Sequence, residues 1–283
     1  MGNIKFTKMQ ATGNDFIIIE TSKSRSWAAL ARAMCERRFG VGADGIILVM
    51  PSKKADIRMR MFNPDGSEAE ACGNGTRCLV RYVIDRGLVG CREMTIETLG
   101  GLRKARPAGK LIQVDMGEPI FKSGLIPVKA VCDTVIDRPL AIGGRRLKLT
   151  CLSMGNPHAV AFIDEPADKF PLEVIGPQVE NHRFFPNRVN FEIANVINVH
   201  TIRARVWERG AGETLSCGTG ACAIAVAARL HRFCDKEVNV ELPGGTLTVY
   251  WDGKGEVKLT GPAEKVFDGE WPDLKGPLEK VRI

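Results

Sequence analysis

The sequence has few histidines and lacks the cysteine spacing that metal sites and disulfide exchange use. Four histidines occur in 283 residues, and no two of the nine cysteines stand in a Cys-x-x-Cys pair. Structural zinc sites and thioredoxin-like redox motifs depend on such pairs. We therefore predict no metal site and no redox exchange, and we expect free thiols in a reducing cytoplasm.

Long apolar runs and clustered aromatic residues are also scarce. No apolar stretch approaches the ~18 residues that a membrane span needs, and no secretory signal pattern is found. The net charge of +7 comes from scattered basic residues, and aromatic residues make up 6% of the chain. A nucleic-acid surface needs a basic stripe with stacking rings. We predict a cytoplasmic protein that binds neither membrane nor nucleic acid.

One short motif is present twice, half a chain apart. Cys72 and Cys217 each precede a Gly-x-Gly turn, and they lie 145 residues apart in the 283-residue chain. Gly13-Asn14 and Gly155-Asn156 repeat at nearly the same interval, 142 residues. Two matched offsets predict two similar halves, each presenting one thiol. The length suits two domains of roughly 140 residues.

The hydrophobic pattern of each half is dominated by strands. Each cysteine motif is followed by one apolar helix, predicted over residues 76–85 in the first half and 221–233 in the second. A helix that is apolar on all sides is typical of a buried one, with a curled sheet around it. Residues 27–38 predict a further helix, whereas residues 166–186, rich in proline and turn formers, predict a surface loop. The predicted class is α+β.

Two glycine-rich segments raise the alternative of nucleotide binding. Residues 40–45 match G-x-G-x-x-G, but they follow a helix and precede a strand, which is the reverse of a dinucleotide-binding turn. Residues 218–223 fit the looser G-x-G-x-x-A and do open a helix. Only about sixty residues follow, mostly strands, so no alternating α/β sheet fits there. We rank nucleotide binding last.

The two motif cysteines are the strongest candidates for chemistry. Each stands where a helix begins, so the helix dipole and the free backbone N–H groups favour its thiolate. The N–H groups of Gly73, Asn74, Gly218 and Thr219 suit a carboxylate. If the halves face each other, one thiolate removes an α-proton and the opposite thiol returns one to the other face. This scheme predicts a racemase or epimerase without cofactor or metal. The other cysteines are expected to be buried structural residues.

The chain resembles a known family, diaminopimelate epimerase, through motifs that occur in order over most of its length. These are Ala11-Thr-Gly-Asn-Asp-Phe16, Phe62-Asn-Pro-Asp-Gly66, Ala71-Cys-Gly-Asn-Gly-Thr-Arg-Cys78, Gly155-Asn-Pro-His158, Val189-Asn190, Glu208-Arg-Gly-Ala-Gly-Glu-Thr214 and Ser216-Cys-Gly-Thr-Gly-Ala221. The resemblance implies a cofactor-independent isomerase that interconverts LL- and meso-2,6-diaminopimelate in the pathway to lysine and cell-wall precursors. Its small-molecule substrate is a diamino dicarboxylate, and family members are often homodimers.

The resemblance also implies a fold and a set of site residues. The fold has two pseudo-symmetric domains, each a curled β-sheet or barrel around a central helix, with the active site in the cleft between them. We expect domains at 1–117 and 118–263, with a strand at about 264–283 returning to the first. Cys72 and Cys217 are the catalytic pair, described as donor and acceptor, with His158 and Glu208 in support. The expected substrate-binding residues are Asn14, Asn63, Gly73, Asn74, Asn156, Asn190, Glu208, Arg209, Gly218 and Thr219.

Two points stay open at this stage. Many family members carry glutamine where this chain has Gly45, so the resemblance carries no substrate contact there. A proline- or hydroxyproline-type racemase or epimerase of the same layout is the nearest alternative. Arg209 favours diaminopimelate, because a guanidinium can bind a second, distal carboxylate through two parallel hydrogen bonds.

Overall fold

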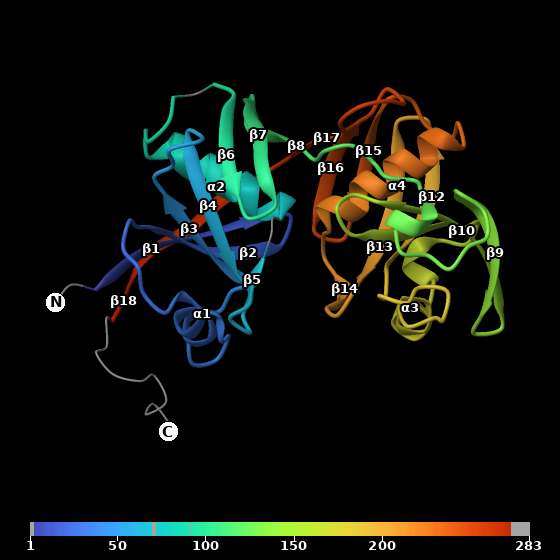
Figure 1. The fold of residues 1–283 in the computed structure, drawn as a ribbon, viewed down its shortest axis with the longest axis horizontal. Coiled ribbons are helices and arrows are strands. Elements are labelled where there is room, and N and C mark those ends of the chain that lie inside the picture. The colour runs from blue at the N-terminus through green and yellow to red at the C-terminus, as the bar shows by residue number, and fades with distance from the viewer. Residues whose placement is uncertain (1–2, 70–71, 91, 273–283) are drawn as a thin grey trace. The chain divides into compact units, whose positions relative to one another are not determined.

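The computed structural model describes residues 3–69, 72–90 and 92–272 of the chain. Ala71 of the first cysteine motif, Cys91 and the predicted strand positions 273–283 lie outside these ranges. The described chain divides into two compact units. Unit 1 comprises the described residues up to Val114 and from Pro262 onward, and unit 2 comprises Asp115–Gly261. Each unit is drawn with its elements labelled in Figure 1.

Unit 1 is built mainly from strands, with two helices. Its elements in chain order are β1 (Ile4–Ala11), β2 (Asn14–Glu20), α1 (Trp27–Cys35), β3 (Gly45–Met50), β4 (Ile57–Phe62), β5 (Glu68–Ala69), α2 (Gly73–Asp85), β6 (Met94–Thr98), β7 (Gly101–Ala108), β8 (Leu111–Asp115, which ends at the boundary) and β18 (Glu264–Trp271). Strand β18 pairs antiparallel with β1, although the two are more than 250 residues apart in sequence.

Unit 2 contains the same kinds of element. They are η1 (Ser123–Leu125), β9 (Val135–Ile142), β10 (Arg145–Ser153), β11 (Pro157–Phe162), η2 (Ala167–Lys169), α3 (Leu172–Glu180), β12 (Asn190–Asn198), β13 (Thr201–Glu208), β14 (Gly212–Thr214), α4 (Gly218–Leu230), β15 (Glu237–Leu242), β16 (Gly245–Tyr250) and β17 (Lys258–Gly261). Among the described helices, none is long and apolar enough to cross a membrane.

The two units repeat one strand topology. In unit 1, β2 runs parallel to β3 and β4 runs parallel to β6, whereas β1–β2, β3–β4 and β6–β7 pair antiparallel. In unit 2, β11–β12 and β13–β15 are the parallel pairs, and β10–β11, β12–β13 and β15–β16 are antiparallel. The outer strand β9 pairs with β10 as β18 pairs with β1. The predicted α+β fold of two pseudo-symmetric halves is confirmed.

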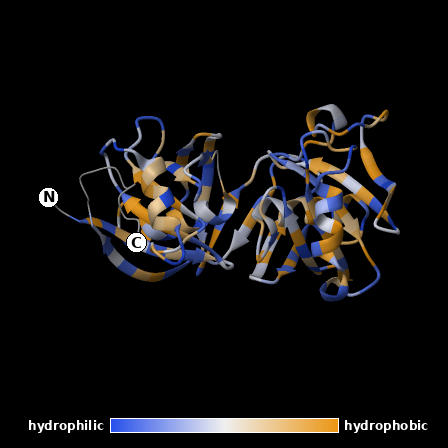
Figure 2. Ribbon diagram, turned by 90° about the horizontal axis from the view of Figure 1, so that it is seen from below, coloured by the Kyte–Doolittle hydropathy of each residue, from blue (hydrophilic) through white to orange (hydrophobic). Residues whose placement is uncertain are grey.

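Each unit has one helix at the centre of its strands. Helix α4 packs against β10, β11, β12, β15, β16 and β17, and α2 packs against β1, β2, β3, β7 and β18. All but three of the 13 residues of α4 are buried. Alanine is the commonest residue of α4, and its small side chain lets strands approach the helix closely on every side. In Figure 2 the outer loops of the units are mostly hydrophilic, and hydrophobic colour is concentrated on strands and helices.

The prediction of a surface loop at residues 166–186 is wrong. It contains η2 and helix α3, with the side chains of Phe170, Leu172, Ile175, Val179 and Phe185 buried in the core of unit 2. The prediction relied on proline content, but Pro171 stands just before the helix, and Pro177 is tolerated inside it. The repeat carried the missing signal, because α3 lies 145 residues after α1, the helix that connects β2 and β3.

Smaller differences concern the ends of elements and one thiol. Helix α1 ends at Cys35, before the predicted Arg38, and Glu36 takes an extended conformation. Cys132 is exposed, contrary to the expectation of a buried structural cysteine.

Candidate active site

Both motif cysteines occupy the same backbone position. Cys72 is the residue immediately before α2, with φ −140° and ψ 123°, and Cys217 precedes α4 with φ −122° and ψ 115°. The first helical hydrogen bonds run from Thr76 N to Cys72 O, 2.8 Å, and from Ala221 N to Cys217 O, 2.9 Å. The first-turn N–H groups that follow each thiol have no partner within the helix and form a site for an anion.

A glycine three residues after each thiol lets the helix start lie close to the sheet. A Cβ at Gly75 would lie 3.1 Å from Ile47 Cδ1, and one at Gly220 would lie 3.2 Å from both Glu192 Oε1 and Cys217 Cβ. The third helical position therefore carries no side chain in either unit. The repeated Gly-x-Gly thus has a packing reason as well as a chemical one.

In unit 1 the structure brings together the predicted residues Asn14, Cys72, Gly73 and Asn74, which we call the first half-site. The Cys72 thiol donates to Asn14 Oδ1 over 3.8 Å, and Asn74 Nδ2 donates to the same oxygen over 3.2 Å. Arg77, fully buried in α2, donates to Asn74 Oδ1 at 2.9 Å and fixes that amide. The Asn14 carbonyl oxygen therefore faces the start of α2.

The orientation of Asn14 is set by a carboxylate that the sequence prediction missed. Asp44 Oδ2 accepts from Asn14 Nδ2 at 2.6 Å and from the Asp15 backbone N–H at 3.0 Å. Arg37 contacts Asp15 and Asp44, at 2.9 Å and 2.6 Å, and Lys8 Nζ lies 2.7 Å from Asp15. Burial alone would raise the pKa of Asp15, but Arg37 and Lys8 lower it. Asp44 is thus held in place by a charged cluster.

In unit 2 the predicted residues Asn156, His158, Cys217, Gly218 and Thr219 lie together. With Glu192, which was not predicted, we call them the second half-site. Cys217 Sγ lies 3.5 Å from Thr219 Oγ1, which accepts from Asn156 Nδ2 at 3.3 Å. Asn156 Oδ1 lies 2.9 Å from His158 Nε2. The thiol is therefore the end of a continuous chain of polar contacts.

This series of polar contacts ends at Glu192, the third residue of β12. His158 Nδ1 lies 2.6 Å from Glu192 Oε1, and both side chains are fully buried. Burial raises the pKa of Glu192, while His158 opposes the rise. The available signal was an acidic residue inside the apolar segment from Val189 to Ile193. A buried charged residue needs a partner, and His158 is that partner.

Burial also dominates the ionisation of Cys217. Burial raises the pKa of the Cys217 thiol well above its ordinary value, and the negative charges of Glu208 and Glu192 raise it further. The hydrogen bond with Thr219 and the Gly220 backbone N–H act in the opposite direction. Glu208 acts on this thiol through its negative charge, and Thr214 Oγ1 donates to Glu208 Oε1 at 2.6 Å.

Three other predicted residues lie outside the two half-sites: Asn190 begins β12, and Arg209 and Asn63 follow the ends of β13 and β4. Asn190 Nδ2 donates to Pro157 O at 3.0 Å, and its Oδ1 accepts from the Arg209 backbone N–H at 2.8 Å. Asn190 thus ties the start of β12 to the loop that carries Arg209, whose side chain is exposed. Asn63 donates to Ser67 Oγ within its own turn, over 3.0 Å.

Gly45 corresponds to Asn190 in the repeat, since Gly45 pairs with Phe16 as Asn190 pairs with His158. A Cβ at Gly45 would lie 2.9 Å from the Phe62 carbonyl oxygen. The backbone around Gly45 therefore leaves no room for a side chain such as the glutamine that many family members carry at this position.

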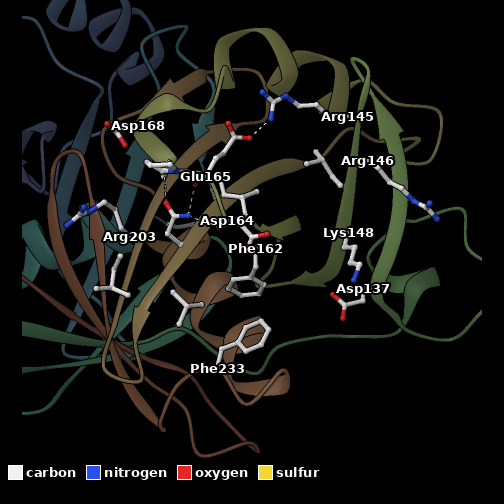
Figure 3. Close-up of a pocket in the computed structure, with 17 residues that line it drawn as sticks. Asp137, Arg145, Arg146, Lys148, Phe162, Asp164, Glu165, Asp168, Arg203 and Phe233 are labelled. Atoms are coloured by element: carbon white, nitrogen blue, oxygen red, sulfur yellow. Dashed lines mark hydrogen bonds and ion pairs between the residues drawn. The ribbon is translucent and has the colours of Figure 1, made fainter.

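A large cavity on unit 2 does not coincide with these residues. It measures about 1070 Å³ and is lined by charged residues of both signs. Figure 3 shows Arg145 directed toward Glu165, with which it forms an ion pair. Asn195 in its wall donates to two backbone oxygens, at 2.7 and 2.8 Å. None of the predicted site residues lines this cavity, and its polar groups largely satisfy one another. Within the described ranges, no cluster of His, Cys, Asp or Glu suits a metal ion.

Solved structures define the class to which this fold belongs. The chain is similar to a probable proline racemase from Agrobacterium radiobacter K84, with a TM-score of 0.70, 15% identity, and coverage of 98% of this chain and 94% of that one. It is also similar to a hydroxyproline epimerase from Agrobacterium vitis, with a TM-score of 0.69, 14% identity, and coverage of 95% and 92%. A Bacillus anthracis phenazine biosynthesis protein of the PhzF family gives 0.68 at 20% identity, covering 95% and 99%. The fold is the one shared by these racemases, epimerases and PhzF proteins.

Sequence comparison narrows this class to one family. The diaminopimelate epimerase family profile matches residues 6–122 and 150–266. A diaminopimelate epimerase of Acetivibrio thermocellus is 47% identical over 277 residues, which is 94% of this chain and 98% of the relative. One from Moorella thermoacetica is 46% identical over 276 residues, covering 94% and 99%. The chain belongs to the diaminopimelate epimerase family.

Proposed function

We propose that this protein is an isomerase that interconverts LL- and meso-2,6-diaminopimelate, with Cys72 and Cys217 as the two acid–base groups. The observation that carries the proposal is the repeated half-site: each unit places one thiol at a helix start, with an asparagine from the start of a strand (Asn14) or from the turn before one (Asn156) bonded to the thiol or to the neighbouring Thr219. Family membership and the relatives' shared name support the substrate.

The proposed reaction needs both thiols to reach one α-carbon from opposite faces. A thiolate on one face takes the α-proton and becomes a thiol, and the opposite thiol gives its proton to the other face and becomes a thiolate. The α-carbon is inverted, and the total number of protons is unchanged. In the reverse direction the two sulfurs exchange roles.

The charge that develops on the reacting carboxylate would be stabilised by the helix starts. The first-turn N–H groups after Cys72 and Cys217, on Gly73, Asn74, Gly218 and Thr219, can donate to the carboxylate oxygens. Donors aimed at developing charge in a site without bulk water typically contribute about 10²–10³ in rate each. The proposed chemistry uses side chains and backbone alone.

The remaining predicted residues suit the distal end of the substrate. Arg209 has an exposed guanidinium whose Nη1 donates to Asn187 O at 3.2 Å, which leaves its other donors for a carboxylate. Asn190 fixes the backbone of the Arg209 loop. Glu208 can accept from an ammonium group or act on Cys217, and Asn14 and Asn156 line the two thiols. A homodimer and a cytoplasmic location also remain predictions.

The test is proton NMR of the reduced protein with LL-diaminopimelate in heavy water, without added cofactor. We expect the α-proton signal to disappear while the meso isomer accumulates. Exchange on proline or hydroxyproline, with none on diaminopimelate, would favour the alternative racemase class. No exchange on any of these substrates would leave the cysteines as structural residues and refute the proposal.

A further inference from the structure

His158 and Glu192 form a pair whose side chains are both fully buried in unit 2. The Glu192 carboxylate interacts with His158 and with the backbone N–H of Ala159, and within the described part of the chain its Oε2 has no hydrogen-bond partner. A buried carboxylate that keeps its charge without full hydrogen bonding is costly. A neutral histidine beside an ionised Glu192 would leave one net negative charge in the core of unit 2.

The cost is avoided if the pair holds one more proton and is neutral overall. The shared proton can lie on the Glu192 carboxyl group or on His158 Nδ1, and in both cases His158 Nε2 carries its own proton. Nε2 then acts as a donor, and the atom facing it at 2.9 Å is Asn156 Oδ1, which can only accept. The geometry and the charge argument agree.

We propose that Glu192 and His158 share one proton and, through Asn156, turn the Thr219 hydroxyl toward the Cys217 sulfur as a hydrogen-bond donor. This inference rests on the proposed function only for the acid–base role of Cys217. Glu192 is a positioning residue in this scheme, since it touches neither Cys217 nor, by its burial, a substrate.

We call this series of hydrogen bonds the relay, and the direction of each bond in it fixes the direction of the next. With its oxygen facing His158, Asn156 presents Nδ2 to Thr219 Oγ1 at 3.3 Å. The Thr219 oxygen then accepts, so its own hydrogen is available for Cys217 Sγ, 3.5 Å away. A donor to sulfur stabilises the thiolate over the thiol. Loss of the Nε2 proton would reverse every link and turn Cys217 into the donor.

In the first half-site the hydrogen bond of the thiol runs in the opposite direction, because the Cys72 thiol is the donor. In the matched register of the parallel strands, Phe16 and Ile47 stand where unit 2 has His158 and Glu192. Asn14 presents its Nδ2 to Asp44 and its Oδ1 to the Cys72 thiol, which donates to it. An acceptor beside the sulfur favours the thiol. The two asparagines therefore turn opposite ends of their amide groups toward the two thiol sites.

The charged groups around Cys217 determine in which direction a Glu192 variant should shift the pKa of this thiol. Among the described residues these are Glu208 at the end of β13 and Glu192 in β12, and both act to raise the pKa of the thiol. If Glu192 were ionised beside a neutral His158, removing its charge would lower the pKa of Cys217. If the pair is neutral and acts through hydrogen bonds, replacing Glu192 with glutamine preserves the relay, because a glutamine N–H can donate to His158 Nδ1.

The first measurement is the protonation of His158 by ¹⁵N NMR of protein labelled on histidine. Only four histidines are present, so the His158 ring can be assigned by its absence in His158→Gln. We expect Nε2 to carry a proton throughout pH 6–9, in the parent and in Glu192→Gln. An Nε2 without a proton at neutral pH would overturn the proposal, and the measurement requires no substrate.

The second measurement is the ionisation of Cys217 from its thiolate absorbance, taken as the difference from the same protein carrying Cys217→Ser. Glu192→Gln should leave the pKa of Cys217 within about 0.3 unit, whereas Thr219→Val, which removes the donor, should raise it by about one unit. Glu192→Leu should shift it upward as well, since leucine cannot hold the His158 ring. The exposed Glu237→Gln in the same unit is the matched control and should leave the pKa of Cys217 unchanged.

Two outcomes would contradict the relay. A lower Cys217 pKa in both Glu192 variants would show that Glu192 acts as a plain negative charge. An unchanged pKa in a folded Thr219→Val variant would show that the hydroxyl does not donate to sulfur. Because all these readouts use the free protein, they stand even if the enzyme fails on diaminopimelate, and activity on diaminopimelate would not rescue them.

Discussion

Replacing Gly220 with alanine places a methyl group where the second half-site has little room. The new Cβ would lie 3.2 Å from Cys217 Cβ, 3.2 Å from Glu192 Oε1 and 3.3 Å from Val206 Cγ2. None of these atoms is free to move away from the added methyl group. Cys217 Cβ is fixed by the backbone before α4, Glu192 is held by His158 at 2.6 Å, and Val206 is fully buried.

The equivalent change in unit 1 is a matched control. At Gly75 the added Cβ would meet Ile47 Cδ1 at 3.1 Å, Met59 Cε at 3.3 Å and Met61 Sδ at 3.5 Å. These atoms lie at or near the ends of flexible side chains, and methionine adapts readily to a changed space. Alanine in place of glycine also favours a helix by up to about 1 kcal/mol. Gly75→Ala should therefore change the free energy of unfolding by less than about 0.5 kcal/mol.

For Gly220→Ala the same helical gain is offset by overpacking, which costs about 1–3 kcal/mol. The expected net destabilisation is about 1–2 kcal/mol, or a fall of roughly 3–8 °C in the Tm of unit 2. Thermal unfolding monitored by circular dichroism, and α-proton exchange on diaminopimelate, test the pair. Exchange should fall at least about tenfold in Gly220→Ala, because Cys217 and Glu192 are displaced, and it should persist in Gly75→Ala. Equal losses in both variants would refute the reasoning.

Three further predictions address the thiols, the charged cluster of unit 1 and helix α3. Cys72→Ser and Cys217→Ser should each lower epimerisation by at least about 10²-fold with an unchanged circular dichroism spectrum, because serine is a far weaker acid; normal turnover in either would exclude the two-thiol scheme. Lys8→Met should reduce the free energy of unfolding by about 1–3 kcal/mol at pH 7. The pKa of Asp15 is lowered in the folded protein, so the part of this contribution that comes from the ion pair is present above the ordinary value of 3.8 and is lost as the pH falls through the lowered pKa; a parent–variant difference that does not shrink in urea titrations as the pH falls below 3.8 would contradict the assignment. Gly176→Ala should destabilise unit 2 by about 1–3 kcal/mol, since its Cβ would lie 2.5 Å from the Trp207 ring, whereas Gly124→Ala, with nothing within 4 Å, should have no effect on thermal unfolding.

Much of the fold was predictable because the sequence repeats its pattern in each half. Strand periodicity and the two apolar helices gave the α+β class, and the Gly-x-Gly motifs placed both thiols at helix starts. Helix α3 was missed, because proline content was weighed more heavily than the repeat. Pro177 is tolerated there because α3 is held by tertiary packing, with Gly176 against Trp207. Local helix propensity predicts structure poorly where packing in a core determines the conformation.

The sequence alone determined the family, the pair of candidate thiols and their position at two helix starts, because these depend on local spacing and on motifs contiguous in the chain. Only the tertiary structure showed that Asp44 turns Asn14 one way and that the buried His158–Glu192 pair turns Asn156 the other way. The Asn14–Asp44 and His158–Glu192 contacts join residues 30 and 34 apart in the chain, brought together by parallel strand pairs. The direction of a hydrogen bond depends on burial and charge at that place, which no local pattern encodes.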